Sequence, residues 1–210
     1  MSNLRAAVAR VQDAQIASKK PLAVVLAGHN GSGKSTLWYE RLAGRFQIPL
    51  INADRMMMSV LPEANERGLA AWAARLRDTD GSWMQVSQRG VQAFVAQAML
   101  HGVPFAMETV FSDWRAQADG RIASKIDLLR EMQEAGYFVL LLFVGLASDQ
   151  ISIARVSTRV AKGGHAVQES KLISRFPRTQ RAIAAALDVA NAAILVDNSR
   201  EPKHAFTVCH

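Results

Sequence analysis

The sequence predicts an α/β fold, with a parallel five-stranded sheet that is covered by helices on both faces. Short apolar runs alternate with longer segments whose apolar residues recur at helical spacing, which is typical of βαβ units. A glycine-rich segment, residues 28–36, lies between the first apolar run and a helical segment. Ligands bind at the carboxyl ends of the strands in such sheets, so this segment is the first candidate for a site.

Five apolar runs are predicted to form the strands, and the segments between them the helices. The predicted strands are 22–27, 48–52, 103–107, 137–144 and 193–197. The predicted helices are 34–46, 66–77, 85–101, 119–135, 149–161 and 169–190. Because the strands are parallel, their carboxyl ends share one edge of the sheet, and the residues just after each strand are the functional candidates.

The segment before the first strand has its own character. Apolar and polar residues alternate over residues 2–19 at the spacing of an amphipathic helix. Such a helix either packs on the domain or extends from it to bind a partner. We therefore divide the chain into an N-terminal helix, 1–20, and a single domain, 21–210.

The composition is that of a globular protein. Half of the 210 residues are apolar and 20% are charged. No apolar run approaches the roughly 20 residues that span a bilayer, and residues 1–20 lack the apolar core of a signal peptide. The one cysteine, Cys209, cannot form an internal disulfide. These features predict a cytoplasmic protein that does not associate with membranes.

The charge balance favours anionic partners. The formal net charge is +7 and the sequence pI is about 10.1. Many arginines fall between residues 155 and 181, and no aromatic residues alternate with them as stacking platforms would require. A surface that handles phosphate groups is therefore favoured over one that binds nucleic acid.

Residues 28–36 match the phosphate-binding pattern G-x-x-x-x-G-K-[ST]. The glycines allow backbone N–H groups to turn toward one anion, and the following helix adds its positive end. Lys34 can reach the β- and γ-phosphates, and Ser35 can hold Mg²⁺. His29 lies inside this loop, and its side chain is expected to point away from the phosphates. The residues predicted to bind the nucleoside triphosphate, ATP or GTP, are Gly28, Asn30, Gly31, Ser32, Gly33, Lys34, Ser35 and Thr36.

Acidic residues follow the second and third predicted strands. Asp54 can take the proton from an attacking hydroxyl group, or it can simply cap a helix that starts near Arg55. Glu108 can hold Mg²⁺ directly or through water, can bind a substrate hydroxyl, or can face solvent as an ordinary strand-end carboxylate. Thr109 can donate to the substrate or cap the next helix. We expect Asp54, Glu108 and Thr109 to form the substrate side of the site.

An arginine-bearing helix is predicted to form a lid around residues 155–167. Arg155 and Arg159 are one helical turn apart and share a face, and Gly163-Gly164 ends the helix. A lid arginine stabilises the charge on a transferred phosphoryl group, although a solvated basic face would give the same pattern. Arg175, Arg178 and Arg181 also share a face, and either close on the phosphates or face solvent.

Together these segments resemble the zeta toxin family, in the version found in many Gram-negative chromosomes. The resemblance covers roughly residues 20–200. It rests on the phosphate loop, on Ile51-Asn52-Ala53-Asp54, on residues 105–112 (FAMETVFS), on residues 155–167 (RVSTRVAKGGHAV), on Ile173-Ser174-Arg175-Phe176 and on Asp197-Asn198-Ser199. It implies a P-loop kinase fold, phosphorylation of a sugar hydroxyl, typically on UDP-N-acetylglucosamine, and inhibition by an antitoxin protein.

The resemblance also implies residue roles. Asp54 matches the catalytic base, Lys34 the phosphate-loop lysine, and Arg155 or Arg159 the lid arginine on the γ-phosphate. Arg175 is the candidate for a second phosphate arginine, and Asn198 and Ser199 lie where such kinases hold adenine. Residues 61–82, which would shape the acceptor pocket, match no pattern.

Two other functions compete with a small-molecule kinase. A nucleotide-binding regulatory module would hydrolyse ATP slowly and act through a protein partner, using the N-terminal helix and the basic surface. A nucleic-acid kinase is suggested by the charge alone.

Overall fold

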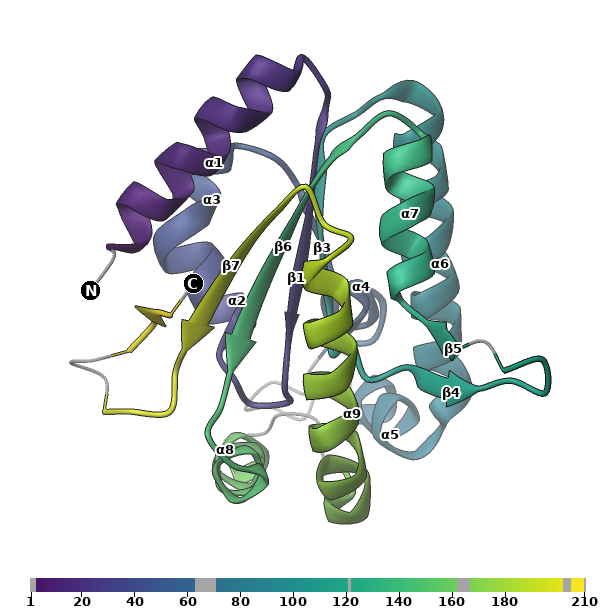
Figure 1. The fold of residues 1–210 in the computed structure, drawn as a ribbon. Coiled ribbons are helices and arrows are strands. Elements are labelled where there is room, and N and C mark those ends of the chain that lie inside the picture. The colour runs from purple at the N-terminus through teal and green to yellow at the C-terminus, as the bar shows by residue number, and fades with distance from the viewer. Residues whose placement is uncertain (1–2, 63–70, 121, 162–166, 202–204, 210) are drawn as a thin grey trace.

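The computed structural model describes residues 3–62, 71–120, 122–161, 167–201 and 205–209, and it confirms the α/β fold (Figure 1). The main sheet has six strands in the order β2-β3-β1-β6-β7-β8. These strands are β1 (Leu22–Gly28), β2 (Leu50–Ile51), β3 (Phe105–Thr109), β6 (Phe138–Gly145), β7 (Ala192–Asp197) and β8 (Thr207–Val208). All of these pairings are parallel except that of β7 with β8.

The prediction of five strands is wrong by one, because β8 was not expected. This strand is two residues long and pairs antiparallel with β7, with Val196 opposite Val208. The Cys209 N–H extends the pairing by donating to the Leu195 carbonyl at 2.8 Å. An apolar run this short has no periodicity of its own, so only the neighbouring strand makes it visible.

Most helices alternate with the strands as the periodicity predicts, but the helix over Ala53–Val60 was not among the predicted ones. They are α1 (Leu4–Ser18), α2 (Lys34–Leu37), α3 (Ala43–Phe46), α4 (Ala53–Val60), α5 (Ala71–Thr79), α6 (Gly81–His101), α7 (Ile126–Glu134), α8 (Asp149–Ala161) and α9 (Glu169–Leu187), with a π-helical turn, η1 (Trp38–Leu42), between α2 and α3. The predicted helix 66–77 begins outside the described residues. No helix in the described ranges is both long enough and apolar enough to cross a bilayer.

The predicted helix 119–135 is partly wrong. Its first part is a strand, β5 (Ile122–Ser124), which pairs antiparallel with β4 (Trp114–Ala116) in a separate two-stranded sheet. Gly120, at φ 79°, makes the turn, and its N–H donates to the Gln117 carbonyl at 3.0 Å. A glycine in this backbone conformation ends helical periodicity.

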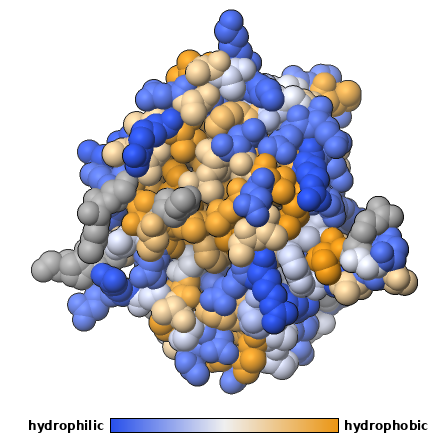
Figure 2. Space-filling model, in the orientation of Figure 1, coloured by the Kyte–Doolittle hydropathy of each residue, from blue (hydrophilic) through white to orange (hydrophobic). Residues whose placement is uncertain are grey.

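Strand β1 lies at the centre of the sheet and is buried along its whole length. Leu22, Val24 and Leu26 face the core with α1 and the α2–α3 segment, while alternate residues face the core with α6, α7 and α9. Helix α1 packs on the sheet through Ala7, Val8 and Val11. Figure 2 shows apolar side chains in the middle of this view, where β6 and β7 lie in Figure 1.

The parallel register aligns the carboxyl ends of the central strands. Ala27 of β1 pairs with Thr109 of β3, and Gly28 pairs with Val144 of β6. The segments that follow these strands therefore meet at one edge, next to α4 and α8 (Figure 1).

We expect Tyr137→Phe to lower the free energy of unfolding by about 1–3 kcal/mol. The Tyr137 side chain is fully buried, and its hydroxyl lies 2.6 Å from the Ala98 carbonyl and 2.9 Å from the Val103 carbonyl, to which it donates. Removal of the hydroxyl breaks both of these hydrogen bonds, while the Ala98 carbonyl keeps the Val103 N–H as a donor at 3.0 Å. Urea unfolding of both proteins tests this, and an unchanged midpoint and slope would contradict it.

Candidate active site

The phosphate loop connects the end of β1 to the start of α2. Gly31 (φ 69°) and Gly33 (φ 88°) adopt positive φ angles that favour glycine. Gly33 is the N-cap of α2 and provides no side-chain hydrogen bond to the helix. The first N–H groups of the helix are therefore left for a ligand, which is the arrangement that binds phosphate.

Lys34 is buried at the centre of the site. Its Nζ donates to the Gly28 carbonyl at 3.2 Å and to the His29 carbonyl at 3.0 Å, and lies 3.7 Å from Glu108 Oε1. Burial lowers the pKa of Lys34 below its ordinary value, and the positive charge of Arg159 acts in the same direction. The carboxylates of Glu108 and Asp54 oppose this lowering of the pKa. The charges of all three residues therefore act on Lys34.

Glu108 connects three segments of the site and is only 13% exposed. Its Oε2 accepts hydrogen bonds from Ser35 Oγ at 2.8 Å and from Asn52 Nδ2 at 2.6 Å. It is therefore not a solvent-facing carboxylate at a strand end. The Ser35 hydroxyl and the Glu108 carboxylate are hard oxygen donors that lie together beside the phosphate loop, and such donors fit Mg²⁺.

Helix α4 begins with Asn52, not with Asp54, as its cap. Asn52 Oδ1 accepts hydrogen bonds from the Asp54 N–H at 2.8 Å and from the Arg55 N–H at 3.3 Å. Asp54 lies in the first turn with an exposed side chain. The capping interpretation of Asp54 is therefore wrong, and its carboxylate is free of that role beside Lys34.

Helix α8 packs directly against the phosphate loop. Ser152 Oγ donates to the Asn30 carbonyl at 2.7 Å, and Arg155 Cβ would lie 3.1 Å from a Cβ built on Gly31. Arg155 therefore starts beside the loop, and the charge of Arg159, one turn on, acts on Lys34. The Gly163-Gly164 break of the predicted lid lies outside the described residues.

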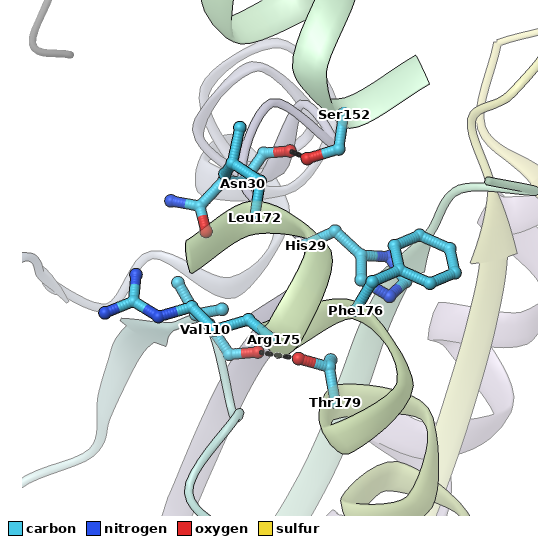
Figure 3. Close-up of a pocket in the computed structure, with 8 residues that line it drawn as sticks. All are labelled: His29, Asn30, Val110, Ser152, Leu172, Arg175, Phe176 and Thr179. Atoms are coloured by element: carbon cyan, nitrogen blue, oxygen red, sulfur yellow. Dashed lines mark hydrogen bonds between the residues drawn. The ribbon is translucent and has the colours of Figure 1, made fainter. Parts of the chain in front are cut away.

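The three arginines of α9 lie in different surroundings. Arg175 lines a small pocket with Asn30 and Val110, and Figure 3 shows its guanidinium group extending to the same side as the Asn30 amide. Burial lowers the pKa of Arg175, and the charge of Arg178 adds to this effect. Arg178 Nε donates to the Ser174 carbonyl at 3.0 Å, and Arg181 is exposed. Arg175 is thus the arginine of this group that the fold brings to the loop.

Thr109 lies on the sheet face opposite to Glu108. Its side chain is 8% exposed, and its Oγ1 accepts hydrogen bonds from Lys125 Nζ and, at 3.3 Å, from the Phe111 N–H. Phe111 itself is buried with φ 61°, an uncommon conformation for a bulky residue. The Thr109 hydroxyl therefore supports the segment that follows β3, at the edge where the site lies.

Asn198 and Ser199 follow β7, and both make hydrogen bonds near the site. Asn198 Nδ2 donates to the Ser32 carbonyl at 2.8 Å. Ser199 Oγ accepts from the Ala147 N–H at 2.7 Å and donates to Asp197 Oδ1 at 2.5 Å. Thr36, in α2, has an exposed side chain.

Three residues of this site were missed by reasoning from the sequence. Asn52 holds both Glu108 and the start of α4, and its signal was an amide at a predicted helix start. Ser152 and Lys125 act on segments far away in the chain, with separations of 122 and 16 residues, and have no local pattern that could reveal them.

Acid should destabilise the protein through His29, which is 3% exposed. Burial lowers the pKa of His29 from 6.5 to about 4, the charge of Lys34 adds to this, and the Phe176 backbone opposes it weakly. Below pH 6.5 the unfolded chain binds a proton at His29, whereas the folded chain does not bind it until the pH is near 4. The contribution of neutral His29 to the free energy of unfolding is therefore fully present above pH 6.5 and is lost as the pH falls toward 4.

At about 1.4 kcal/mol per pKa unit, we expect this loss to reach ~3 kcal/mol for the wild-type protein. The His29→Phe variant has no group that titrates at this position, so its unfolding free energy should fall less. Urea unfolding at about pH 7 and about pH 4.5 measures both losses. Equal losses in the two proteins would contradict the assignment.

Comparisons with known proteins show the family and the fold of the chain. The family model for zeta toxin matches residues 5–202. An uncharacterized protein of Haemophilus influenzae is 27% identical over 155 residues, which cover 73% of this chain and 91% of that protein.

Three solved structures share the fold. A putative kinase from Chloroflexus aurantiacus is 19% identical with a TM-score of 0.52, and the match covers 86% of each chain. A structure from the PezAT chromosomal toxin-antitoxin system of Streptococcus pneumoniae is 13% identical with a TM-score of 0.58, covering 98% of this chain and 79% of that one. The AvrRxo1-ORF1:-ORF2 structure with ATP is 14% identical with a TM-score of 0.59, covering 93% and 60%. Because the family model matches nearly the whole chain, the chain belongs to the zeta toxin family.

Proposed function

We propose that the protein is a cytoplasmic, ATP-dependent kinase that phosphorylates a hydroxyl group of a sugar-type small molecule. UDP-N-acetylglucosamine or a related nucleotide sugar is the proposed acceptor. The family and the P-loop kinase-like fold support a kinase-type nucleotide-binding protein. The observation that carries the proposal is the cluster in which Glu108 contacts both Lys34 and Ser35, and the charge of the Asp54 carboxylate acts on the same lysine.

The donor half of the site would hold the triphosphate. The backbone N–H groups of residues 30–36 and the Lys34 ammonium would surround the β- and γ-phosphates. Ser35 and Glu108 would hold Mg²⁺, which when bound neutralises charge on the phosphate oxygens. In the described ranges no group of three or more His, Cys, Asp and Glu side chains could hold a metal, so most remaining ligands would be phosphate and water oxygens. Asn198 and Ser199 would border the adenine.

The acceptor half would use Asp54 as the base. The acceptor hydroxyl gives its proton to the Asp54 carboxylate while its oxygen forms a bond to the γ-phosphorus. The bond from that phosphorus to the β–γ bridging oxygen breaks, and ADP leaves. Arg155 or Arg159 from α8, and Arg175 from α9, would stabilise the charge that develops on the transferred group. Glu108 and Thr109 would form or support the acceptor side.

A partner protein is also proposed. A structure of the PezAT toxin-antitoxin system and a complex of AvrRxo1-ORF1 with AvrRxo1-ORF2 are among the similar structures. An antitoxin that covers the site is the corresponding partner for this chain.

Incubation of the protein with γ-labelled ATP and a panel of nucleotide sugars, followed by mass spectrometry, tests the function. We expect the label in a sugar hydroxyl of one nucleotide sugar. Release of labelled inorganic phosphate alone, from all acceptors and from a metabolite extract, would contradict the kinase. That outcome would favour a regulatory module that hydrolyses ATP slowly.

A further inference from the structure

His29 is the second residue of the phosphate loop, and its ring joins the loop to two other segments. The imidazole stacks on the Phe176 ring of α9, with centroids 4.0 Å apart and an interplanar angle of 13° (Figure 3). The edge of the Phe143 ring, from β6, lies 5.5 Å away. His29 Nδ1 accepts a hydrogen bond from the Leu146 N–H at 3.3 Å. The side chain is thus packed into the protein.

The residues next to this stack carry the polar groups of the site. Asn30 follows His29 in the loop, and Arg175 precedes Phe176 in α9; both line the pocket in Figure 3. The stack is thus a direct contact between the loop and the turn of α9 that carries the guanidinium group. In the same part of α9, Thr179 Oγ1 donates a hydrogen bond to the Val110 carbonyl at the edge of the site, at 3.4 Å.

The contacts of the His29 ring indicate that it holds neighbouring segments in place and does not only fill space. Burial lowers the pKa of His29 to about 4, so the imidazole is neutral near pH 7. The flat face of the ring makes the contact with Phe176 of α9, whereas Nδ1 accepts the hydrogen bond from the Leu146 N–H after β6; the contact with α9 therefore needs only an aromatic face.

We propose that His29 is a positioning residue, which holds α9 against the phosphate loop so that Arg175 reaches the γ-phosphate of a bound nucleoside triphosphate. The inference rests on the proposed function for the role of Arg175 only. It predicts that loss of the stack weakens the binding of ATP more than that of ADP, because the γ-phosphate is the part that ADP lacks.

Calorimetric binding of ATP and ADP tests this with four variants. The His29→Leu change fills the space but cannot stack, and the matched His29→Phe change keeps an aromatic face. We expect His29→Leu and Arg175→Met each to weaken ATP binding by about tenfold and ADP binding by less than about twofold, and His29→Phe to stay within about threefold of wild type for both. The double variant His29→Leu/Arg175→Met should bind ATP no more weakly than Arg175→Met alone.

Two results would overturn the proposal. One is an additive effect in the double variant, and the other is an equal loss of ATP and ADP binding in His29→Leu, as a general disturbance of the loop would produce. Urea unfolding checks that each variant is folded, and the His29→Phe result decides the role of the ring if His29→Leu does not fold. These binding measurements do not depend on phosphoryl transfer. If the effects of His29→Leu and Arg175→Met on ATP binding are coupled but no acceptor is phosphorylated, only the proposed function is contradicted. If an acceptor is phosphorylated but the two effects are additive, only this inference is contradicted.

Discussion

Asp54→Asn should lower kcat for phosphoryl transfer by about 10³-fold while ATP affinity stays within about twofold of wild type. The amide is nearly the same size as the carboxylate but cannot take the proton from the acceptor hydroxyl. The start of α4 should stay intact, because the cap is Asn52 and its bond comes from the Asp54 backbone N–H, which the substitution keeps. A loss of kcat with unchanged nucleotide binding is the signature of a group needed in the transition state.

The measurement compares labelled transfer from ATP with calorimetric binding of ATP. Asp127→Asn is the matched control, since Asp127 is an exposed acidic residue in the first turn of α7 that pairs with Arg130 at 2.9 Å. The control should keep wild-type turnover. If Asp54→Asn also keeps wild-type turnover, Asp54 is not the base.

Gly28→Ala should destabilise the protein by about 1–3 kcal/mol and weaken ATP binding by at least about tenfold. A Cβ at this position would lie 2.5 Å from the Val144 carbonyl oxygen and 2.7 Å from Ser32 Oγ. The carbonyl belongs to the backbone of β6, which pairs with β1 at this residue, so it cannot move aside without disturbing the centre of the sheet. The phosphate loop begins here, and a shift of its first residue moves the N–H groups that follow.

Gly44→Ala is the same chemical change, but we expect it to raise the free energy of unfolding. Gly44 lies in α3, and a Cβ there meets nothing within 4 Å. Alanine is the better helix former, so this variant should be more stable by about 0.5–1 kcal/mol. Urea unfolding ranks the three proteins, and a Gly28→Ala variant as stable as Gly44→Ala would contradict the close contact at the loop.

Much of the site could be predicted because its residues lie in local patterns. The phosphate loop has its glycines and Lys34 within nine residues, 28–36, and Asp54 and Glu108 each lie at or just after the end of an apolar strand. A parallel sheet brings such strand ends to one edge, so their meeting follows from fold class alone. The role of Asp54 is a prediction that the Asp54→Asn variant tests, and the roles of Lys34, Ser35 and Glu108 stay predictions.

Other features are set by contacts between distant segments. Thr109 shares the strand end with Glu108, yet the alternation of side chains turns it to the other face, where Lys125 donates to it. Arg175, Arg178 and Arg181 share one pattern in the sequence, but packing of α9 on the loop brings only Arg175 of these three to the pocket. Strand β8 exists because β7 offers it an edge.

By itself, therefore, the sequence determined the α/β class, the phosphate loop and the acidic residues at the strand ends, because hydrophobic periodicity and glycine geometry are local properties of the chain. Only the tertiary structure decided that Asn52 caps α4, that Glu108 joins Ser35 to Asn52, and that His29 stacks on Phe176. These contacts depend on how helices and strands pack after they form. His29 and Phe176 are 147 positions apart, and no local sequence pattern around either residue indicates their contact.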